Sequence, residues 1–198
     1  MSDYKFTKDW FSWAPPIWKQ VFEQMPRRKH FLEIGSFEGR STVWLVENAL
    51  EDGGEIVCVD TWQGGEEHVR QGLNMNYAEQ NFDHNMRVLK DNFQDRWVNK
   101  IKEKSVDALV GFYTEGSRFD FIYIDGSHIA ADVITDACLA WPLLNPGGVM
   151  VFDDYRWGEP IPETHKPKMA VDAFVGIFQE QLYVVNSGYQ MIIQKREA

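Results

Sequence analysis

Short apolar runs alternate with amphipathic stretches along most of this chain. Runs rich in β-branched and aromatic residues predict strands, and stretches with an apolar residue every three or four positions predict helices. The predicted strands cover residues 30–34, 55–60, 97–102, 119–125 and 148–153, with two more around a glycine turn within 182–195. The predicted helices cover residues 10–25, 41–50, 76–93, 105–113, 129–144 and 168–181. Repeated strand–helix units followed by a hairpin predict a doubly wound α/β sheet, parallel except for an antiparallel strand near one edge.

Acidic side chains stand where the fourth and fifth predicted strands end. The fourth strand stops at Asp125, and the fifth stops at Asp153 and Asp154. Because a helix connects these two strands, we expect them to be parallel, and neighbouring strands place their ends roughly 5 Å apart. Three carboxylates this close repel one another, and their oxygens suit a hard divalent cation such as Mg²⁺. The sequence therefore predicts a metal site at this edge, with His128 a turn away.

A loop containing two glycines follows the first predicted strand, at residues 33–42. Its G-x-x-x-G spacing, with Gly35 and Gly39, matches neither a dinucleotide fingerprint nor a phosphate-binding loop. Glu33 beside the loop suits the ammonium group of a ligand. Ser41 at the helix start can bind a carboxylate through its hydroxyl and backbone N–H. The loop favours a zwitterionic ligand, and an ordinary strand–helix turn with a serine cap is the alternative.

Further polar residues follow the second and third predicted strands. Asp60 ends the second strand, where a carboxylate typically accepts both hydroxyls of a ribose; a turn or helix cap is the alternative. Trp62 can stack on an adenine or form part of the wall of the substrate pocket; simple packing in the core is the alternative. Ser105 offers a hydroxyl to an adenine or caps the next helix. An amino-acid end, a ribose and an adenine together describe S-adenosylmethionine (SAM).

With these motifs in place, residues 10–195 resemble a class I SAM-dependent methyltransferase. The segments that carry the resemblance are LEIGSFEGRST (32–42), VDTW (59–62), FDFIYIDGSH (119–128) and WPLLNPGGVMVFDDY (141–155). The chain is similar to the macrocin-type branch of small bacterial O-methyltransferases, and more distantly to catechol O-methyltransferase. The resemblance implies a seven-stranded Rossmann-like sheet of order 3-2-1-4-5-7-6. We expect a single domain over residues 1–198, with a helical cap at 1–29 and the core at 30–198.

The resemblance also implies roles for individual residues. Asp125, Asp153 and Asp154 are expected to bind Mg²⁺ or another hard divalent cation, and His128 is expected to be the general base. The alternatives are a solvent-facing residue at a helix start for His128, and helix-cap and loop chemistry without a metal for Asp153 and Asp154. The expected SAM-binding residues are Glu33, Gly35, Ser36, Gly39, Ser41, Asp60, Thr61, Trp62, Ser105 and Asp125. The expected activity is O-methylation of a small hydroxylated acceptor, either a sugar or a catechol-like compound. Two alternatives stay open: a non-methylating, metal-dependent hydroxylase-like relative, and a catalytically silent SAM-binding module.

Two segments bear on the choice of acceptor. The tryptophan-rich residues 10–25 can cover the pocket or form a homodimer. The loop of residues 155–167 overhangs the site in this fold, and a rigid solvent-exposed loop is the alternative. Its candidate acceptor contacts are Arg156, Trp157, Glu159 and His165.

Composition narrows the partners. The 198 residues carry a formal net charge of −10, which disfavours nonspecific binding to nucleic acid or to an anionic membrane. The first residues lack the apolar core of a signal peptide, and no apolar run approaches the roughly 18 residues of a membrane span. Cys58 and Cys138 are predicted to be buried, reduced thiols. We therefore expect a cytoplasmic enzyme whose partner is a small molecule.

Overall fold

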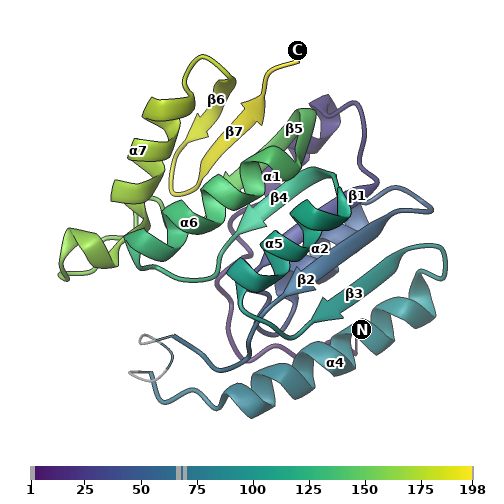
Figure 1. Ribbon diagram of the computed structural model, residues 1–198. Coiled ribbons are helices and arrows are strands. Elements are labelled where there is room, and N and C mark those ends of the chain that lie inside the picture. The colour runs from purple at the N-terminus through teal and green to yellow at the C-terminus, as the bar shows by residue number, and fades with distance from the viewer. Residues whose placement is uncertain (1–2, 66–67, 69–70, 198) are drawn as a thin grey trace.

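The computed structural model describes residues 3–65, 68 and 71–197, which form a seven-stranded sheet with helices on both faces (Figure 1). The strand order is β3-β2-β1-β4-β5-β7-β6, which confirms the predicted order. Strands β1 to β5 pair in parallel, and β7 pairs antiparallel with both β5 and β6. The strands are β1 (His30–Ile34), β2 (Glu55–Val59), β3 (Trp97–Ile101), β4 (Phe119–Ile124), β5 (Leu144–Phe152), β6 (Leu182–Ser187) and β7 (Met191–Lys195). The helices are α1 (Pro15–Gln24), α2 (Arg40–Asn48), α4 (Met75–Asn92), α5 (Ser105–Glu115), α6 (Ala130–Ala140) and α7 (Pro167–Phe178), with short 3-10 helices η1 (Trp141–Leu143) and η2 (Glu163–His165).

Two apolar layers lie on opposite faces of the sheet. On one face, α5 and α7 pack through residues such as Leu109 and Phe174. On the other face, α1 and α4 pack through residues such as Trp18 and Phe82. Figure 1 shows α5, α6 and α7 in front of the sheet and α1 and α2 behind it. Every residue of β4 is buried, because a central parallel strand is covered on both faces.

Backbone hydrogen bonds continue past the strand ends and place the following loops side by side. The amide of Asp125 donates to the carbonyl of Ile34 at 2.8 Å. The amide of Asp153 donates to the carbonyl of Ile124 at 3.0 Å. The carboxyl ends of β1, β4 and β5 therefore meet at one edge, which is where ligands bind in open α/β sheets.

Residues 3–14 form an irregular segment that is fixed to the loop after β1 and to α4. Thr7 donates its amide and its hydroxyl to the carboxylate of Glu38, at 2.6 and 2.8 Å. The amide of Lys5 donates to Oδ1 of Asn85 on α4 at 2.7 Å. Glu38 and Asn85 are buried, so these contacts attach the segment to the interior of the protein.

Helix α1 links this N-terminal segment to the C-terminal hairpin. Trp18 on α1 is buried, and its Nε1 donates to Oε1 of Gln190, between β6 and β7, at 2.7 Å. Its ring also packs edge-on against Tyr123 of β4, with centroids 4.9 Å apart. Residues that lie 172 positions apart in the chain are thus in direct contact.

Three element boundaries differ from the prediction where prolines stand. Helix α1 begins at Pro15 rather than at residue 10, because proline has no N–H to donate to the preceding turn. Helix α6 ends at Ala140 rather than at residue 144, since Pro142 cannot continue its hydrogen-bond ladder. Strand β5 begins at Leu144 rather than at residue 148, and an irregular pairing with β4 accommodates the additional residues.

The two cysteines differ in their exposure to solvent. Cys58 is buried as predicted, whereas Cys138 is exposed, because the buried face of α6 is formed by Val133, Ala137 and Ala140 instead. In the part of the chain that the structure describes, no helix combines the length and apolar character needed to cross a membrane.

Candidate active site

A cavity of about 1120 Å³ opens at the carboxyl ends of β1, β2, β4 and β5. Ligand pockets usually enclose roughly 300–1,000 Å³, so this one is large enough for a cofactor and a small second ligand. The predicted site residues that line it are Gly35, Asp60, Thr61, Ser105, Asp125, His128, Asp153 and Asp154. The other five predicted site residues are not among the described residues that line the cavity: Glu33, Ser36, Gly39, Ser41 and Trp62.

The two predicted glycines allow close approaches of the loop after β1. Gly35 has a φ of 85°, and a Cβ there would lie 2.0 Å from the carbonyl oxygen of Asp125. Gly39 has a φ of 75°, and a Cβ there would lie 2.8 Å from Cε of Met86 on α4. Only glycine combines the left-handed conformation with such contacts at low cost. Gly35 therefore sets the loop directly against the backbone that carries Asp125.

Asp60 fixes the shape of the same loop. Its Oδ2 accepts hydrogen bonds from the amides of Ser36 and Phe37, both at 2.9 Å. Its Oδ1 accepts the amide of Trp62 at 2.7 Å. Phe37 and Trp62 have positive φ angles of 46° and 49°, which are rare for bulky residues and are typically found at functional sites. Asp60 thus stabilises a strained loop at the cavity wall.

Three predicted cofactor residues support this loop from beneath. Glu33 is fully buried and accepts hydrogen bonds from Oγ of Ser41 at 2.6 Å and from Oγ1 of Thr42. Burial raises the pKa of Glu33, and these hydroxyl donors partly oppose the rise. Trp62 is buried and packs against Phe82, with ring centroids 5.0 Å apart. The hydroxyl of Ser41 and the ring of Trp62 are therefore engaged by the protein itself.

Ser105 lines the cavity from the first turn of α5. The N-cap of this helix is Lys104, so Ser105 does not have the capping role that was its alternative. Its side chain is hydrogen-bonded to Asp136 of α6. Burial raises the pKa of Asp136 to about 6; the Ser105 hydrogen bond lowers it and the charge of Asp132 raises it. Asp136 lines the cavity, was not predicted from the sequence, and its Oδ1 has no hydrogen-bond partner among the described residues.

Asp125, His128 and Asp154 meet at the ends of β4 and β5. One ligand atom from each of the three lies within 4.8 Å of the others. Nε2 of His128 lies 2.8 Å from Oδ2 of Asp154, which itself has a positive φ of 52°. Asp153 was predicted in the same group but is not part of this trio. Its Oδ1 accepts the amide of Asp154 at 2.8 Å, and its Oδ2 is hydrogen-bonded to Tyr123.

Two tyrosine hydroxyls bind these carboxylates, and neither tyrosine was predicted from the sequence as a site residue. The hydroxyl of Tyr123 lies 3.0 Å from Oδ2 of Asp125 and also contacts Asp153, while Tyr189 donates to Oδ1 of Asp154. A phenol has one proton, so Tyr123 can donate to only one of its two carboxylates at a time. Alternation along β4 puts Tyr123 on the same face as Asp125, a signal that could have identified it. No local pattern links Tyr189 to Asp154.

Burial is the largest influence on the acidic residues of this site. It raises the pKa of Asp125 well above its usual value, and the charges of Asp153 and Asp154 raise it further. Burial also raises the pKa of Asp153 to about 6, again with a contribution from Asp154. A cation among these carboxylates would relieve their repulsion, and oxygen donors beside an imidazole nitrogen suit a divalent metal ion. The residues present therefore fit such an ion.

Comparison with known proteins defines the class of this one. A family model described as a methyltransferase domain matches residues 32–155. The chain belongs to this methyltransferase family, and its sheet has the strand order expected for class I SAM-dependent methyltransferases.

Three similar proteins illustrate the relationship. The chain is 29% identical over 147 residues to O-methyltransferase hkm8 of Aspergillus hancockii, an alignment that covers 73% of this chain and 51% of that relative. It is similar to the structure of an O-methyltransferase from Bacillus cereus in complex with SAH (TM-score 0.63, 21% identity, 92% and 82% of the two chains). It is also similar to MycE methyltransferase from the mycinamycin biosynthetic pathway in complex with Mg, SAH and mycinamycin VI (TM-score 0.63, 15% identity, 96% and 51%). The chain spans about half the length of the curated relatives it matches.

Proposed function

We propose that this protein is a SAM-dependent, Mg²⁺-dependent O-methyltransferase that acts on a small hydroxylated acceptor, a sugar or a catechol-like compound. The observation that carries the proposal is the position of Asp125, His128 and Asp154 within 4.8 Å of one another. Gly35 and Asp60 line the same cavity, so a cofactor site and an acid–base group share one space. The likeness to O-methyltransferase hkm8 and to the Mg- and SAH-bound MycE structure supports the same activity.

The cofactor half of the cavity is formed by the loops after β1, β2 and β3. Oδ2 of Asp60 accepts two loop amides and Oδ1 accepts one, so Oδ1 keeps a lone pair for a ribose hydroxyl. Gly35 allows the amino-acid end of SAM to approach the backbone. Thr61 and Ser105 offer hydroxyls from the walls of the cavity. Glu33, beneath the loop, holds the loop in its binding shape.

The acceptor half is formed at the ends of β4 and β5. Asp125, Asp153 and Asp154 would hold the metal ion, and the hydroxyls of Tyr123 and Tyr189 orient these carboxylates. When bound, SAM supplies the methyl group and the metal ion lowers the pKa of the acceptor hydroxyl. The chain itself supplies position, because a hydroxyl held within about 3 Å of the methyl donor needs little further assistance.

His128 takes up the proton of the acceptor. Oδ2 of Asp154 lies 2.8 Å from Nε2, so a neutral imidazole carries its hydrogen on Nε2 and has its lone pair on Nδ1. Asp154 stabilises the imidazolium that results when His128 takes up the proton. The ring of Trp157 packs against His128 with centroids 4.5 Å apart and limits the access of water to the base.

Calorimetry and turnover together test this proposal. We expect SAH to bind in a calorimetric titration, and we expect SAM to be converted to SAH in the presence of a panel of sugars and catechols. EDTA should abolish turnover, and excess Mg²⁺ should restore it. His128→Ala should lower kcat roughly 100-fold without changing the affinity for SAH, because it removes only the base.

His84→Ala is the matched control. His84 lies on α4 and contacts the backbone of Asp3, so this variant should keep the wild-type rate. Full turnover in EDTA, together with a near-normal rate for His128→Ala, would rule the mechanism out.

A further inference from the structure

Three aromatic side chains from distant segments line the acceptor half of the cavity, and we call them the aromatic wall. Trp13 comes from the N-terminal segment, Trp157 from the loop after β5, and Tyr189 from the turn between β6 and β7. Trp13 and Tyr189 remain 39% and 40% exposed. Large aromatic side chains that stay exposed in a cavity are typical of ligand-binding surfaces.

Direct contacts place the aromatic wall beside the acid–base pair. Tyr189 donates its hydroxyl to Asp154, and the ring of Trp13 lies edge-on to that of Tyr189, with centroids 5.0 Å apart. The ring of Trp157 lies 4.5 Å from that of His128. An acceptor whose hydroxyl reaches His128 is therefore flanked by these rings.

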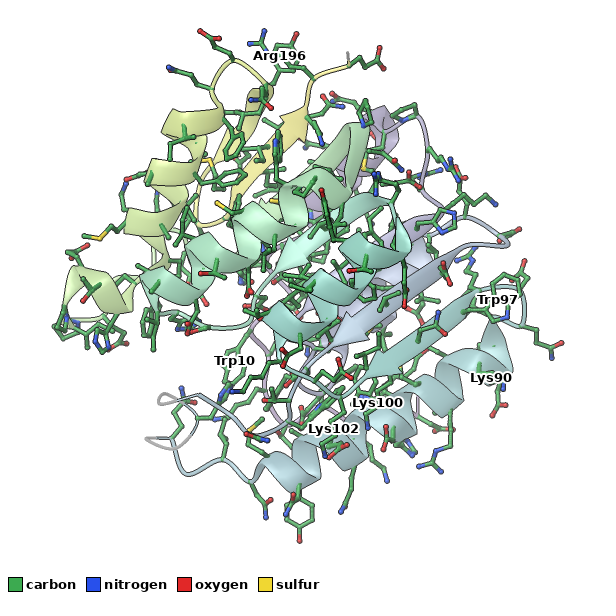
Figure 2. All side chains as sticks on the ribbon, in the orientation of Figure 1. Trp10, Lys90, Trp97, Lys100, Lys102 and Arg196 are labelled. Atoms are coloured by element: carbon green, nitrogen blue, oxygen red, sulfur yellow. The ribbon has the colours of Figure 1, made fainter. Side chains whose placement is uncertain are left out.

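The N-terminal segment holds Trp13 in position before any ligand binds. Nε1 of Trp13 donates to the carbonyl of Trp10 at 2.8 Å, and Thr7 is fixed to Glu38 by two hydrogen bonds. Figure 2 shows Trp10 at the carboxyl end of the parallel strands, where the arrowheads lie. It shows Trp97 at the opposite end of the sheet. A wall that is already ordered lowers the entropic cost of binding.

The cavity is also strongly acidic. Among the described residues that line it, nine are aspartates or glutamates and only Lys104 is a lysine or arginine. Two of the nine, Asp9 and Glu159, come from the same segments as Trp13 and Trp157. Asp9 also lies 3.9 Å from the guanidinium of Arg40, but a solvent-exposed pair at this distance is weak and leaves Asp9 able to bind a second cation. A divalent cation and the sulfonium of SAM would offset only part of this charge. Such a cavity repels carboxylates and phosphates and attracts cations, and aromatic faces bind cations directly.

We propose that the acceptor is a hydroxylated amine, positively charged at neutral pH, whose cation lies between the aromatic wall and Asp9. Acceptors that carry a carboxylate or a phosphate are excluded by charge. The aromatic wall alone would suit a neutral ring equally well; the acidity of the lining decides for the cation. This inference rests on the proposed O-methyltransferase function and adds the charge of its acceptor.

Two matched series of compounds test charge separately from shape. Three catechols carry a two-carbon side chain that ends in an amine, an alcohol or a carboxylate. Glucosamine, glucose and glucuronate repeat the contrast on a sugar. Each compound is titrated calorimetrically into the protein saturated with SAH and Mg²⁺ at pH 7. We expect the amine of at least one series to bind roughly tenfold more tightly than the neutral member, with the carboxylate weakest.

Two variants separate the ring from the charge. Trp13→Ala should weaken the binding of the amine and the neutral compound alike, roughly tenfold, because it removes the stacking face. Asp9→Asn should weaken the amine only, because it removes a charge and keeps the shape. Trp97→Ala is the control, since Trp97 is 53% exposed on β3 at the opposite end of the sheet.

The outcomes distinguish this inference from the function on which it rests. If SAH binds, and in both series the carboxylate or the neutral member binds as tightly as the amine, the amine acceptor is wrong and the methyltransferase function stands. Equal loss of the amine and the neutral compound in Asp9→Asn, or no binding by any of the six compounds, also overturns it. Failure of SAH to bind overturns the proposed function and this inference together.

Discussion

Two groups of carboxylates lie at the same sheet edge and are satisfied in different ways. Around the loop after β1, Glu38 accepts two hydrogen bonds from Thr7, and Asp60 accepts three from backbone amides. At the ends of β4 and β5, Asp125 and Asp153 share the single proton of one phenol, and Asp153 also accepts the amide of Asp154. Each loop carboxylate accepts at least two hydrogen bonds from the chain, whereas the second group gathers three carboxylates with fewer donors and requires a positive partner.

The role of a buried acidic residue therefore follows from the hydrogen-bond donors around it, and not from how many acidic residues lie nearby. A buried carboxylate with several donors stabilises the fold, because the hydrogen bonds offset its loss of hydration. A buried carboxylate with too few donors costs stability, and function is the usual reason for its presence. Four substitutions test this distinction.

Gly35→Ala alters the contact between the loop after β1 and the backbone of Asp125, where the two groups of carboxylates adjoin. The new Cβ would lie 2.0 Å from the carbonyl oxygen of Asp125, at a φ of 85°. We expect the free energy of unfolding to fall by more than about 3 kcal/mol, measured by urea denaturation. Gly111→Ala on α5 is the control: its Cβ would meet nothing within 4 Å, so stability should rise by about 0.5–1 kcal/mol. Equal stability of the two variants would contradict the close approach.

Glu38→Ala removes a fully satisfied carboxylate. It leaves the amide and hydroxyl of Thr7 without their acceptor and releases residues 3–14 from the loop. We expect a loss of about 2–3 kcal/mol in urea denaturation, and faster proteolysis within that segment. Glu180→Ala, at an exposed position, should change stability by less than about 0.5 kcal/mol. A Glu38→Ala protein as stable as this control would show that the loop carboxylates are dispensable.

Asp136→Asn tests an undersatisfied carboxylate outside the metal group. Burial raises the pKa of Asp136 to about 6 in the folded protein, against about 3.9 when unfolded. The folded state therefore holds the extra proton, and stability falls as pH rises from about 4 to above 6. At pH 8 the variant should be more stable than the wild type by about 2 kcal/mol, and near pH 4 the two should converge. Denaturation at both pH values measures this, and a difference that does not change with pH would contradict it.

Asp154→Asn removes a carboxylate of the group that requires a cation. We expect the affinity for Mn²⁺, used as a calorimetric probe, to fall roughly tenfold, which corresponds to about 1.4 kcal/mol. The free energy of unfolding without metal should not fall, because repulsion with Asp125 and Asp153 is relieved. Asp132→Asn, at a cavity carboxylate outside the group, is the control. Equal loss of Mn²⁺ affinity in both variants would disprove the metal centre.

The features that could be predicted from the sequence are those that follow from where a strand ends. The apolar runs before Asp125 and Asp153 identify two buried strands, and parallel pairing then brings the acidic residues together. Gly35 and Gly39 identify the loop after β1 in the same way. Local patterns suffice here, because strand neighbours and register follow from a few general rules.

The acceptor half could not be predicted in the same way. The contact of Trp13 with Tyr189 joins segments that share no local pattern. Nothing in the sequence around Glu38 indicates that its carboxylate binds Thr7, 31 positions away in the chain. Such contacts depend on how irregular segments cross the folded core, and no periodicity of the chain encodes that crossing.

The hydrogen bond between Trp18 and Gln190 has a consequence for biosynthesis. The indole of Trp18 on α1 donates its hydrogen bond to Gln190, which is translated much later. Helix α1 therefore cannot complete its packing until Gln190 has left the ribosome. Long-range closure of this kind slows folding and delays burial of the surrounding aromatic residues. The binding surfaces that depend on the N-terminal segment are thus the last parts of the nascent protein to mature.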